Sequence, residues 1–330
     1  MTPPVTVGLT AVIMAVKDYE ARVLTLKDQG DLSLPNGGFD PERHRTLELG
    51  LRSWVDEQTG VHLGYVEQLY TFGNRHRDPR PEVRDHRIVT VSYLALVGPD
   101  QLPRTPEGLW TPIYDFLPWE DQRKEFSGTM EKLTPDLEDW AREVDSPEET
   151  ELRLGRIRGL FALGTTPWDP EKAILRYELL YEAGLVSESH RDWASCTPEE
   201  RAQLPIKCHC MGDPHQWEKS KTRGREMIMD HRRILASSLG RIRGKIRYRP
   251  VIFELVPQEF TLLHLQKVSE SLTGVPLHKG NFRRLLIQDG LVKETSKKDT
   301  SQPGRPAALF KFRASVVQER PAPGLRRGFP

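Results

Sequence analysis

Residues 261–313 read TLLHLQKVSESLTGVPLHKGNFRRLLIQDGLVKETSKKDTSQPGRPAALFKFR, and they hold the clearest local pattern in the chain. Apolar residues at helical spacing predict two helices, and a turn containing Gly and Pro separates them. Two short strands joined by a polar, basic connection follow. The predicted elements are the helices Thr261–Thr273 and His278–Gln288, the turn Gly274–Pro276, and the strands Leu291–Glu294 and Ala308–Arg313.

Helix, turn, helix and then a β-hairpin with a basic tip is the order of a winged helix, which places its second helix in the major groove of DNA. The charge distribution agrees with this prediction. From Gln216 to the end the chain holds 24 Lys and Arg against 10 Asp and Glu, whereas the preceding residues hold 24 against 37. Such a basic third indicates a nucleic-acid-binding part, and a solvated basic surface is the alternative.

The N-terminal part alternates strands with one helix. Apolar, β-branched runs predict the strands, and a glycine-containing loop precedes a helix with apolar residues at helical spacing. A glycine then stands where a helix C-cap belongs. The predicted elements are the strands Val5–Val16, Val23–Leu26, Val66–Phe72 and Arg87–Val97, the loop Leu34–Gly38, the helix Thr46–Gln58 and the C-cap Gly60. This order predicts an α/β sandwich.

The middle of the chain is acidic, and its pattern is mostly helical. Leu133–Val144 and Lys172–Leu185 are the clearest helices, whereas Ser187–Lys221 is polar and predicts a linker or a mobile loop. A further helix begins with Asp230 as its N-cap, and a short strand is expected at Val251–Leu255.

Together these patterns predict a mixed α/β and α+β protein of three parts. The expected parts are an α/β domain at 1–130, a helical, acidic connecting segment with a polar loop at 131–225, and a winged helix-turn-helix domain at 226–330. No apolar run reaches the roughly 18 residues of a membrane span, and the N-terminus has no signal-peptide pattern. We therefore expect a cytoplasmic protein with no membrane partner.

Cysteine usage gives little support for a metal or disulfide scaffold. The three cysteines Cys196, Cys208 and Cys210 are too few for a disulfide framework in a chain of 330 residues. Cys208 and Cys210, with His215 nearby, suggest zinc, but no second Cys pair or spaced His pair accompanies them. We expect a reduced polar loop here and no metal site.

Residues 34–60, LPNGGFDPERHRTLELGLRSWVDEQTG, resemble the Nudix box, a Pro-x-Gly-Gly loop leading into a helix that ends in Thr-Gly. In active members of that family, carboxylates on this helix bind divalent metal for phosphoanhydride hydrolysis. When the helix is aligned on Gly60, the box's functional positions hold Ser53, Trp54, Glu57 and Gln58. Only Glu57 keeps the family's residue, so we expect no catalytic residues.

Two details of this alignment leave the conclusion unchanged. The family's earlier glutamate falls near Arg45, although Gly38 suggests a one-residue insertion before it. A register shifted by one, which would use Arg52, Asp56 and Glu57, still leaves Ser53 at the position of an essential acid. The resemblance therefore implies a domain that binds a nucleotide without cleaving it.

Longer segments resemble one family over the full length. The N-terminal matches include EQLYTFG at 67–73 and VTVSYLALV at 89–97, and the C-terminal matches include LHKGNFRR at 277–284 and GRPA at 304–307. The segments GLRSWVDEQTG, WEDQR, RYELLYEAGLV and DHRRILA are similar to its longer members. The family is that of the Nudix-like, winged-helix repressors of NAD metabolism, in the NadQ-type branch related to NrtR.

This resemblance implies a homodimeric repressor of NAD biosynthesis or salvage genes that binds double-stranded operator DNA. Two winged helices would meet two half-sites of a palindrome, because the two-fold symmetry of the protein mirrors that of the operator. It also implies a nucleotide effector, for which ATP, NAD and ADP-ribose are the candidates, and no required cofactor.

Candidate DNA contacts lie first on the second winged-helix helix. Four polar residues there supply donors for phosphates or base edges: Lys279, Asn281, Arg283 and Arg284. Asn reads adenine and Arg reads guanine, so Asn281 and Arg283 are the candidates for base contacts. The alternative is that Arg283 and Arg284 only solubilise the helix.

Further cations are candidates for phosphate contact. Arg305 stands in a Gly-Arg-Pro tip and suits a minor groove or a phosphate, while Lys297 and Lys298 suit phosphate positioning. The segment RIRGKIRYR at 241–249 reads as partly structural, because cations at a helix C-terminus also offset its dipole. Within it, Arg243 and Lys245 are candidate phosphate contacts.

Candidate effector contacts lie in the N-terminal domain. Tyr70 and Phe72 share a strand face and suit base stacking, although both also suit a core. Arg77, Arg80 and Arg87 suit the phosphates of a nucleotide, and a charged surface loop is their alternative role.

Two rival functions follow from the same residues. An active Nudix hydrolase of ADP-ribose or NADH with a DNA-binding appendage would need the carboxylates that the box has lost. An RNA-binding adaptor would expose stacking aromatics among its basic residues, whereas the one aromatic residue in the recognition segment, Phe282, stands at a core-like position.

Overall fold

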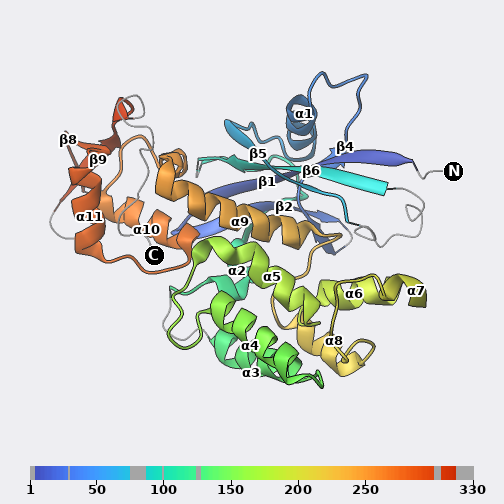
Figure 1. Ribbon diagram of the computed structural model, residues 1–330. Helices are drawn as coiled ribbons and strands as arrows, with labels where there is room; N and C mark the ends of the chain where they lie inside the picture. The colour runs from blue at the N-terminus through green and yellow to red at the C-terminus, as the bar shows by residue number, and fades with distance from the viewer. Residues whose placement is uncertain are drawn as a thin grey trace.

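The computed structural model describes residues 4–28, 30–74, 87–98, 100–123, 128–300 and 306–316. A β-sheet lies between helix α1 (Leu47–Thr59) on one face and helix α9 (His231–Tyr248) on the other (Figure 1). This arrangement confirms the predicted sandwich. A group of shorter helices lies beside it, and the winged helix occupies one end. None of the helices in these ranges is long and apolar enough to cross a membrane.

The central strand β1 (Val5–Lys17) faces both layers at once. Its odd-numbered residues from Leu9 to Ala15 join the core beneath α1, and its even-numbered residues from Val12 to Val16 join the core beneath α9. Strand side chains alternate between the two faces of a sheet, so a continuous apolar run is what a strand covered on both sides requires.

Seven strands form one mixed sheet in the order β3-β2-β1-β6-β5, while β4 pairs with β1 and β7 pairs with β2. The β1–β6 pair is parallel, and the other pairs are antiparallel. The strands are β2 Glu20–Asp28, β3 Asp31–Ser33, β4 Asn36–Gly38, β5 Tyr65–Phe72, β6 Arg87–Leu96 and β7 Gly108–Pro112. The expected loop at 34–38 thus contains a short strand.

The connecting segment is more helical than the sequence indicates. Its elements are α2 Ile113–Phe116, η2 Pro118–Glu120, α3 Gly128–Ala141, α4 Pro147–Phe161, η3 Pro170–Lys172, α5 Ala173–Glu182, α6 Ser187–Ser195, α7 Pro198–Arg201 and α8 Pro214–Lys221. The two helices expected at 133–144 and 172–185 are confirmed as α3 and α5, with shifted ends.

The expectation of a linker or mobile loop at 187–221 is wrong, because α6, α7 and α8 lie within it. Buried polar groups hold α6 in place. Glu188 forms a buried ion pair with Arg232 of α9, 3.0 Å between Oε2 and Nη1, and the His190 ring bonds the Gly184 carbonyl at 2.8 Å. A helix fixed through polar contacts lacks the apolar periodicity by which helices are predicted.

The cysteine loop also differs from expectation. Cys208 and Cys210 form a disulfide, where a reduced polar loop was predicted, and Cys196 is buried and takes no part in that disulfide. The Glu143 carboxylate accepts a hydrogen bond from the backbone N–H of His209 at 3.0 Å and lies beside Cys208 Sγ. These contacts tie the loop to the end of α3.

The winged helix consists of η4 Val251–Leu255, α10 Leu262–Thr273, α11 Lys279–Gln288, β8 Val292–Asp299 and β9 Ala307–Phe312. Thr261 and His278 cap the two helices through their side chains, and Gly274 ends α10 in the left-handed region at φ 73°. The strand expected at 251–255 is instead a 3₁₀ helix. Val251, Ile252 and Leu255 are buried, a helical rather than an alternating spacing.

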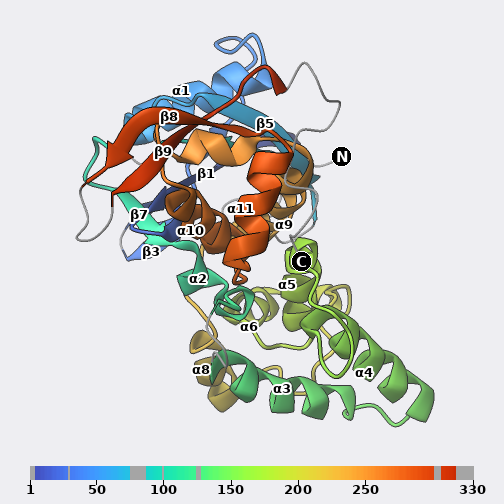
Figure 2. The same cartoon turned by 90° about the vertical axis from the view of Figure 1, so that its left-hand side faces the viewer.

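Helix α9 lies where the parts of the chain meet. It packs most extensively against α5 and η3, and it makes smaller contacts with β5 and β1 of the sheet and with α10 and η4 of the winged helix. The boundary expected at residue 226 stays a prediction. Figure 2 shows α11 and the β8–β9 hairpin facing outward in front of α9.

One buried carboxylate joins these parts. Glu120, at the end of η2, is fully buried and forms ion pairs with Arg176 of α5 and Arg243 of α9. Arg243 also donates to the Leu272 carbonyl of α10 at 3.0 Å and to the Pro170 carbonyl at 3.1 Å. Four elements far apart in the sequence thus meet at one acid.

The backbone around Glu120 packs directly against Gly274, the C-cap of α10. The Gln122 backbone N–H donates to the Gly274 carbonyl at 2.6 Å, and a Cβ on Gly274 would collide with the Glu120 carbonyl oxygen. Burial alone would raise the pKa of the Glu120 carboxyl. The charges and hydrogen bonds of Arg176 and Arg243 outweigh burial, so this pKa lies below its usual value.

We expect Glu120→Gln to lower the free energy of unfolding by about 3–5 kcal/mol, because it leaves two buried guanidinium groups without their anion. Urea unfolding followed by circular dichroism measures this change. Glu151→Gln, which removes an exposed partner of Arg158, is the matched control and should change stability by less than about 1 kcal/mol. Equal effects of the two variants would contradict the structural role of Glu120.

A pH series extends this test. The folded pKa of Glu120 is lowered, so its stabilising contribution is present above the unfolded pKa and is lost as pH falls through the folded value. The stability difference between the wild-type chain and Glu120→Gln should therefore shrink in acid. A difference that grows toward low pH would mean that the carboxylate is not the stabilising form.

Candidate functional site

Two side chains of α1 bind the loop that precedes it. The Gln58 side chain donates to the Asn36 carbonyl at 2.8 Å and accepts from the Asn36 N–H at 3.1 Å. Trp54 Nε1 donates to the Gly38 carbonyl at 2.8 Å, and a Cβ on Gly37 would collide with the indole ring. Trp54 and Gln58, which the sequence alignment sets at acidic positions of the box, thus anchor β4 to α1.

Glu57, the remaining box carboxylate, is about half exposed. It accepts a hydrogen bond from Ser53 Oγ at 3.1 Å and lies 3.9 Å from the Arg43 guanidinium. Within the described ranges, no three His, Cys, Asp or Glu side chains are grouped to hold a metal ion. Glu57 offers one carboxylate on this face of α1, and Mg²⁺ sites use one or two carboxylates together with substrate phosphates.

The two candidate stacking residues have different environments. Tyr70 and Phe72 have ring centroids 5.3 Å apart, yet Tyr70 is 63% exposed and Phe72 is 2% exposed. The β5–β6 register shifts between Gln68 and Thr71, so Tyr70 lies within the irregular stretch and Phe72 after it. The Arg233 guanidinium of α9 covers the Phe72 ring at 5.4 Å. Phe72 is therefore a core residue, the alternative role considered for it, and Tyr70 is the ring open to a ligand.

The candidate arginines of the effector site are only partly described. Arg87 is half-buried at the first position of β6, opposite Val5 of β1. Arg77 and Arg80 lie outside the described residues. Arg87 thus lies where β6 begins, beside the first residue of β1.

Helix α11 presents its polar side chains outward. Lys279 and Arg284 are exposed, Asn281 and Arg283 are half-buried, and Phe282 packs into the core. Arg284 Nη2 donates to Asn281 Oδ1 at 2.8 Å, which links the two on the helix surface. The exposed face is therefore cationic, with one amide among the cations, as an element that enters a DNA groove requires.

The wing carries exposed cations on β8. Lys297 Nζ lies 2.9 Å from the Glu259 carboxylate, and Lys298 is exposed opposite Ala308 of β9. Arg305 lies outside the described residues. Lys298 is thus the freer of the two wing lysines, because Lys297 already has an acidic neighbour.

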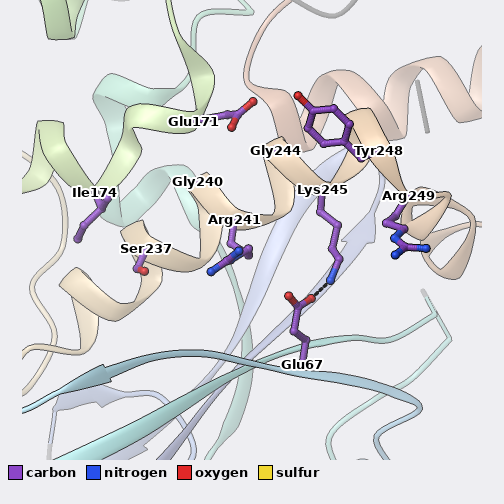
Figure 3. A pocket seen from close by; sticks show the side chains of 10 residues that line it. All are labelled: Glu67, Glu171, Ile174, Ser237, Gly240, Arg241, Gly244, Lys245, Tyr248 and Arg249. Atoms are coloured by element: carbon purple, nitrogen blue, oxygen red, sulfur yellow. Dashed lines mark hydrogen bonds and ion pairs between the residues drawn. The ribbon is translucent and has the colours of Figure 1, made fainter. Parts of the chain in front are cut away.

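Arg243 is a correction to the predicted DNA contacts. Its side chain is fully buried and bound to Glu120, so it faces the core and cannot reach a phosphate in this conformation. Lys245 is also engaged, because its ammonium lies beside the Glu67 carboxylate of β5 (Figure 3). The Tyr65 hydroxyl of the same strand is its second partner. The partly structural role expected for this segment is the one that both residues have.

Sequence reasoning missed three groups that matter to this arrangement. Glu120, Arg176 and Arg232 are buried charges that read as surface residues in a linear sequence. The sequence marked the segment at 241–249 as basic, but it did not show which of its cations face the core. Arg243 points inward, while Arg241 and Arg249 are exposed. A 3.6-residue period through α9, applied to cations as well as to apolar residues, would have separated the two faces.

Comparisons with known proteins agree with this organisation. Residues 252–312 match the family model of the NrtR DNA-binding winged helix domain. The ADPR responsive transcriptional repressor NtrR of Acinetobacter baylyi is 36% identical over 87 residues, which are 26% of this chain and 34% of that protein. The match therefore spans about a third of the length of that relative.

Solved structures show the same fold over nearly the whole chain. Shewanella oneidensis NrtR complexed with a 27mer DNA is 20% identical, with a TM-score of 0.54, and the match covers 94% of this chain and 95% of that one. A MutT/nudix family protein from Enterococcus faecalis is 16% identical, with a TM-score of 0.50 and coverages of 94% and 88%. The chain therefore joins a Nudix-like domain to a winged helix of the NrtR DNA-binding type, and it has the overall fold of NrtR.

Proposed function

We propose that this chain is a DNA-binding transcriptional repressor of NAD biosynthesis or salvage genes, regulated by a nucleotide that its Nudix-like domain binds. One observation carries the proposal. The helix that a winged helix inserts into DNA, α11, exposes Lys279, Arg284 and part of Asn281, and it lies in a segment that matches a DNA-binding domain. As a repressor of this kind, two copies of the chain would bind a palindromic operator.

ADP-ribose is the effector that we favour among ATP, NAD and ADP-ribose. A repressor to which this chain is similar is described as ADPR responsive. In this chain Tyr70 offers an exposed ring on β5, and Arg87 stands at the edge of the same sheet. A ring that stacks on a base and cations that pair with a diphosphate are the contacts that such a ligand needs.

The ion pairs of Glu120 with Arg176 and Arg243 connect the Nudix-like domain to the winged helix, so they could carry an effect of the ligand to the DNA-binding helix. They join η2, which follows the sheet, to the C-terminus of α10, which precedes the recognition helix. A ligand changes DNA affinity only by binding two arrangements of the protein unequally. We infer that the arrangement of α9 against the winged helix is what the two states differ in.

For the DNA interface, we expect Asn281→Ala to weaken operator binding by about 1–3 kcal/mol, with less effect on a scrambled duplex, because a base contact discriminates between sequences. Lys279→Ala should weaken both duplexes about equally and lower the salt dependence by about one counterion. Fluorescence anisotropy over a salt series measures both. Arg158→Ala, an exposed arginine on α4, is the control and should change neither. Equal binding of both duplexes by the wild-type chain would exclude the repressor function.

For the box, we expect ADP-ribose and NADH to remain intact when incubated with the chain and Mg²⁺. Trp54 and Gln58 stand on α1 at the aligned positions of metal-binding acids and bond to the loop instead, which leaves Glu57 as the one box carboxylate. Liquid chromatography of the nucleotides measures this, with an active Nudix hydrolase as the positive control. EDTA-sensitive release of AMP that Glu57→Gln abolishes would establish the rival hydrolase function.

The effector is identified by adding ATP, NAD and ADP-ribose in turn to the operator complex at fixed salt. We expect ADP-ribose to change the anisotropy without being consumed, and Tyr70→Leu to weaken that response. A response to ATP or NAD alone would replace ADP-ribose as the effector. If none of the three nucleotides changes the anisotropy of the operator complex, the proposed regulation by a nucleotide is wrong.

A further inference from the structure

A groove of about 500 Å³ lies along the outer side of α9, away from the Nudix box on α1. Its walls come from three parts of the chain: α9 itself, Glu67 of β5, and Glu171 and Ile174 beside η3 and α5. Figure 3 shows Lys245 reaching from α9 to Glu67, with Arg241 and Arg249 on either side. A volume of this size fits a single nucleotide, since small-molecule sites span roughly 300–1,000 Å³.

The charges in the groove do not cancel. Lys245 is paired with Glu67, and Glu171 is paired with Arg247 at 2.9 Å. Arg241 and Arg249 are exposed, and no ion pair joins either of them to an acid among the residues that the structure describes. Two guanidinium groups therefore leave an excess of positive charge, which matches the two negative charges of a diphosphate diester.

The two guanidinium groups also lie near the Lys245–Glu67 pair. Burial raises the pKa of the Tyr65 hydroxyl beside Lys245, the positive charges of Arg249 and Arg241 oppose that rise, and the charge of Glu254 adds to it. Both arginines line the groove together with Lys245. An anion between them would be attracted by both.

The floor of the groove depends on small residues. A Cβ on Gly240 would come within 2.6 Å of the Glu171 carbonyl oxygen, and one on Gly244 within 2.9 Å of the Glu171 carboxylate. Ser237 continues this face toward the start of the helix. The glycines let η3 approach α9 closely, which gives the groove a second wall.

Tyr248 adds an aromatic surface to the groove. Its ring is 48% exposed and lines the groove one turn beyond Gly244. An exposed aromatic ring beside two arginines is the combination that binds a base and its phosphates together. Continuous duplex DNA fits less well, because Glu67 and Glu171 place carboxylates on both walls, where a polyanion would meet them.

We propose that this groove binds a phosphate-bearing small molecule of the nucleoside diphosphate class, with Arg241 and Arg249 on its phosphates and Tyr248 on its base. Helix α9 leads through Arg249 and Pro250 into η4, the first element of the winged helix. A ligand held here therefore contacts the connection between the two domains. That it regulates DNA binding rests on the proposed function; that it binds does not.

Isothermal titration calorimetry of the full chain with pyrophosphate and with ADP-ribose tests the site. We expect Arg241→Gln and Arg249→Gln each to weaken both ligands about tenfold, because a hydrogen bond to a charged group contributes affinity of that order. Tyr248→Leu should weaken ADP-ribose and leave pyrophosphate unchanged. Arg158→Gln, an exposed arginine on α4, should change neither ligand.

Three results would overturn the proposal. They are no binding of either ligand by the wild-type chain, unchanged pyrophosphate binding by the folded Arg241→Gln/Arg249→Gln double variant, and loss of pyrophosphate binding in Tyr70→Leu but not in that double variant. Circular dichroism confirms that each variant is folded. A short nonspecific duplex that competes fully with pyrophosphate would reassign the groove to the DNA backbone.

DNA binding separates this proposal from the broader one. If ADP-ribose still alters operator binding by the double variant, the groove is not the regulatory site and the repressor function stands. If calorimetry supports the groove but the wild-type chain does not distinguish operator from scrambled DNA, the repressor function fails and the ligand site stands.

Discussion

The structure depends on satisfying one buried negative charge. Glu120 sits where four elements meet, and a carboxylate taken out of water is tolerated only with well-placed partners. Arg176 and Arg243 supply them from α5 and α9, and Arg243 continues to the last turn of α10. The sheet, the connecting helices and the winged helix are therefore held in register by groups that could not be buried separately.

This constraint changes how the charge of the chain is interpreted. The basic excess after Gln216 includes Arg232 and Arg243, which are fully buried and paired with Glu188 and Glu120. Part of the positive charge that indicates a DNA-binding surface is thus internal. Two groups of surface cations remain, one on α11 and the wing and one along α9, beside lysines on α8 and α10.

Prediction from the sequence succeeded where side chains repeat with one period and one polarity. The alternation in β1 and the apolar spacing of α10 and α11 are of this kind, and the turn glycine Gly274 marked a helix end correctly. It failed where a polar residue is buried by a distant partner, as Glu188 is in α6, and where a cation points inward, as Arg243 does. A linear pattern holds no information about partners a hundred residues away.

The contact between Trp54 and the loop at 36–38 also couples two parts of the Nudix-like domain. The indole fills the space above Gly37, and Gln58 closes the loop by two hydrogen bonds to Asn36. Replacing either side chain would remove a support of the loop and would also change the surface of α1. The shape of the loop and the sequence of the helix therefore cannot vary independently of each other.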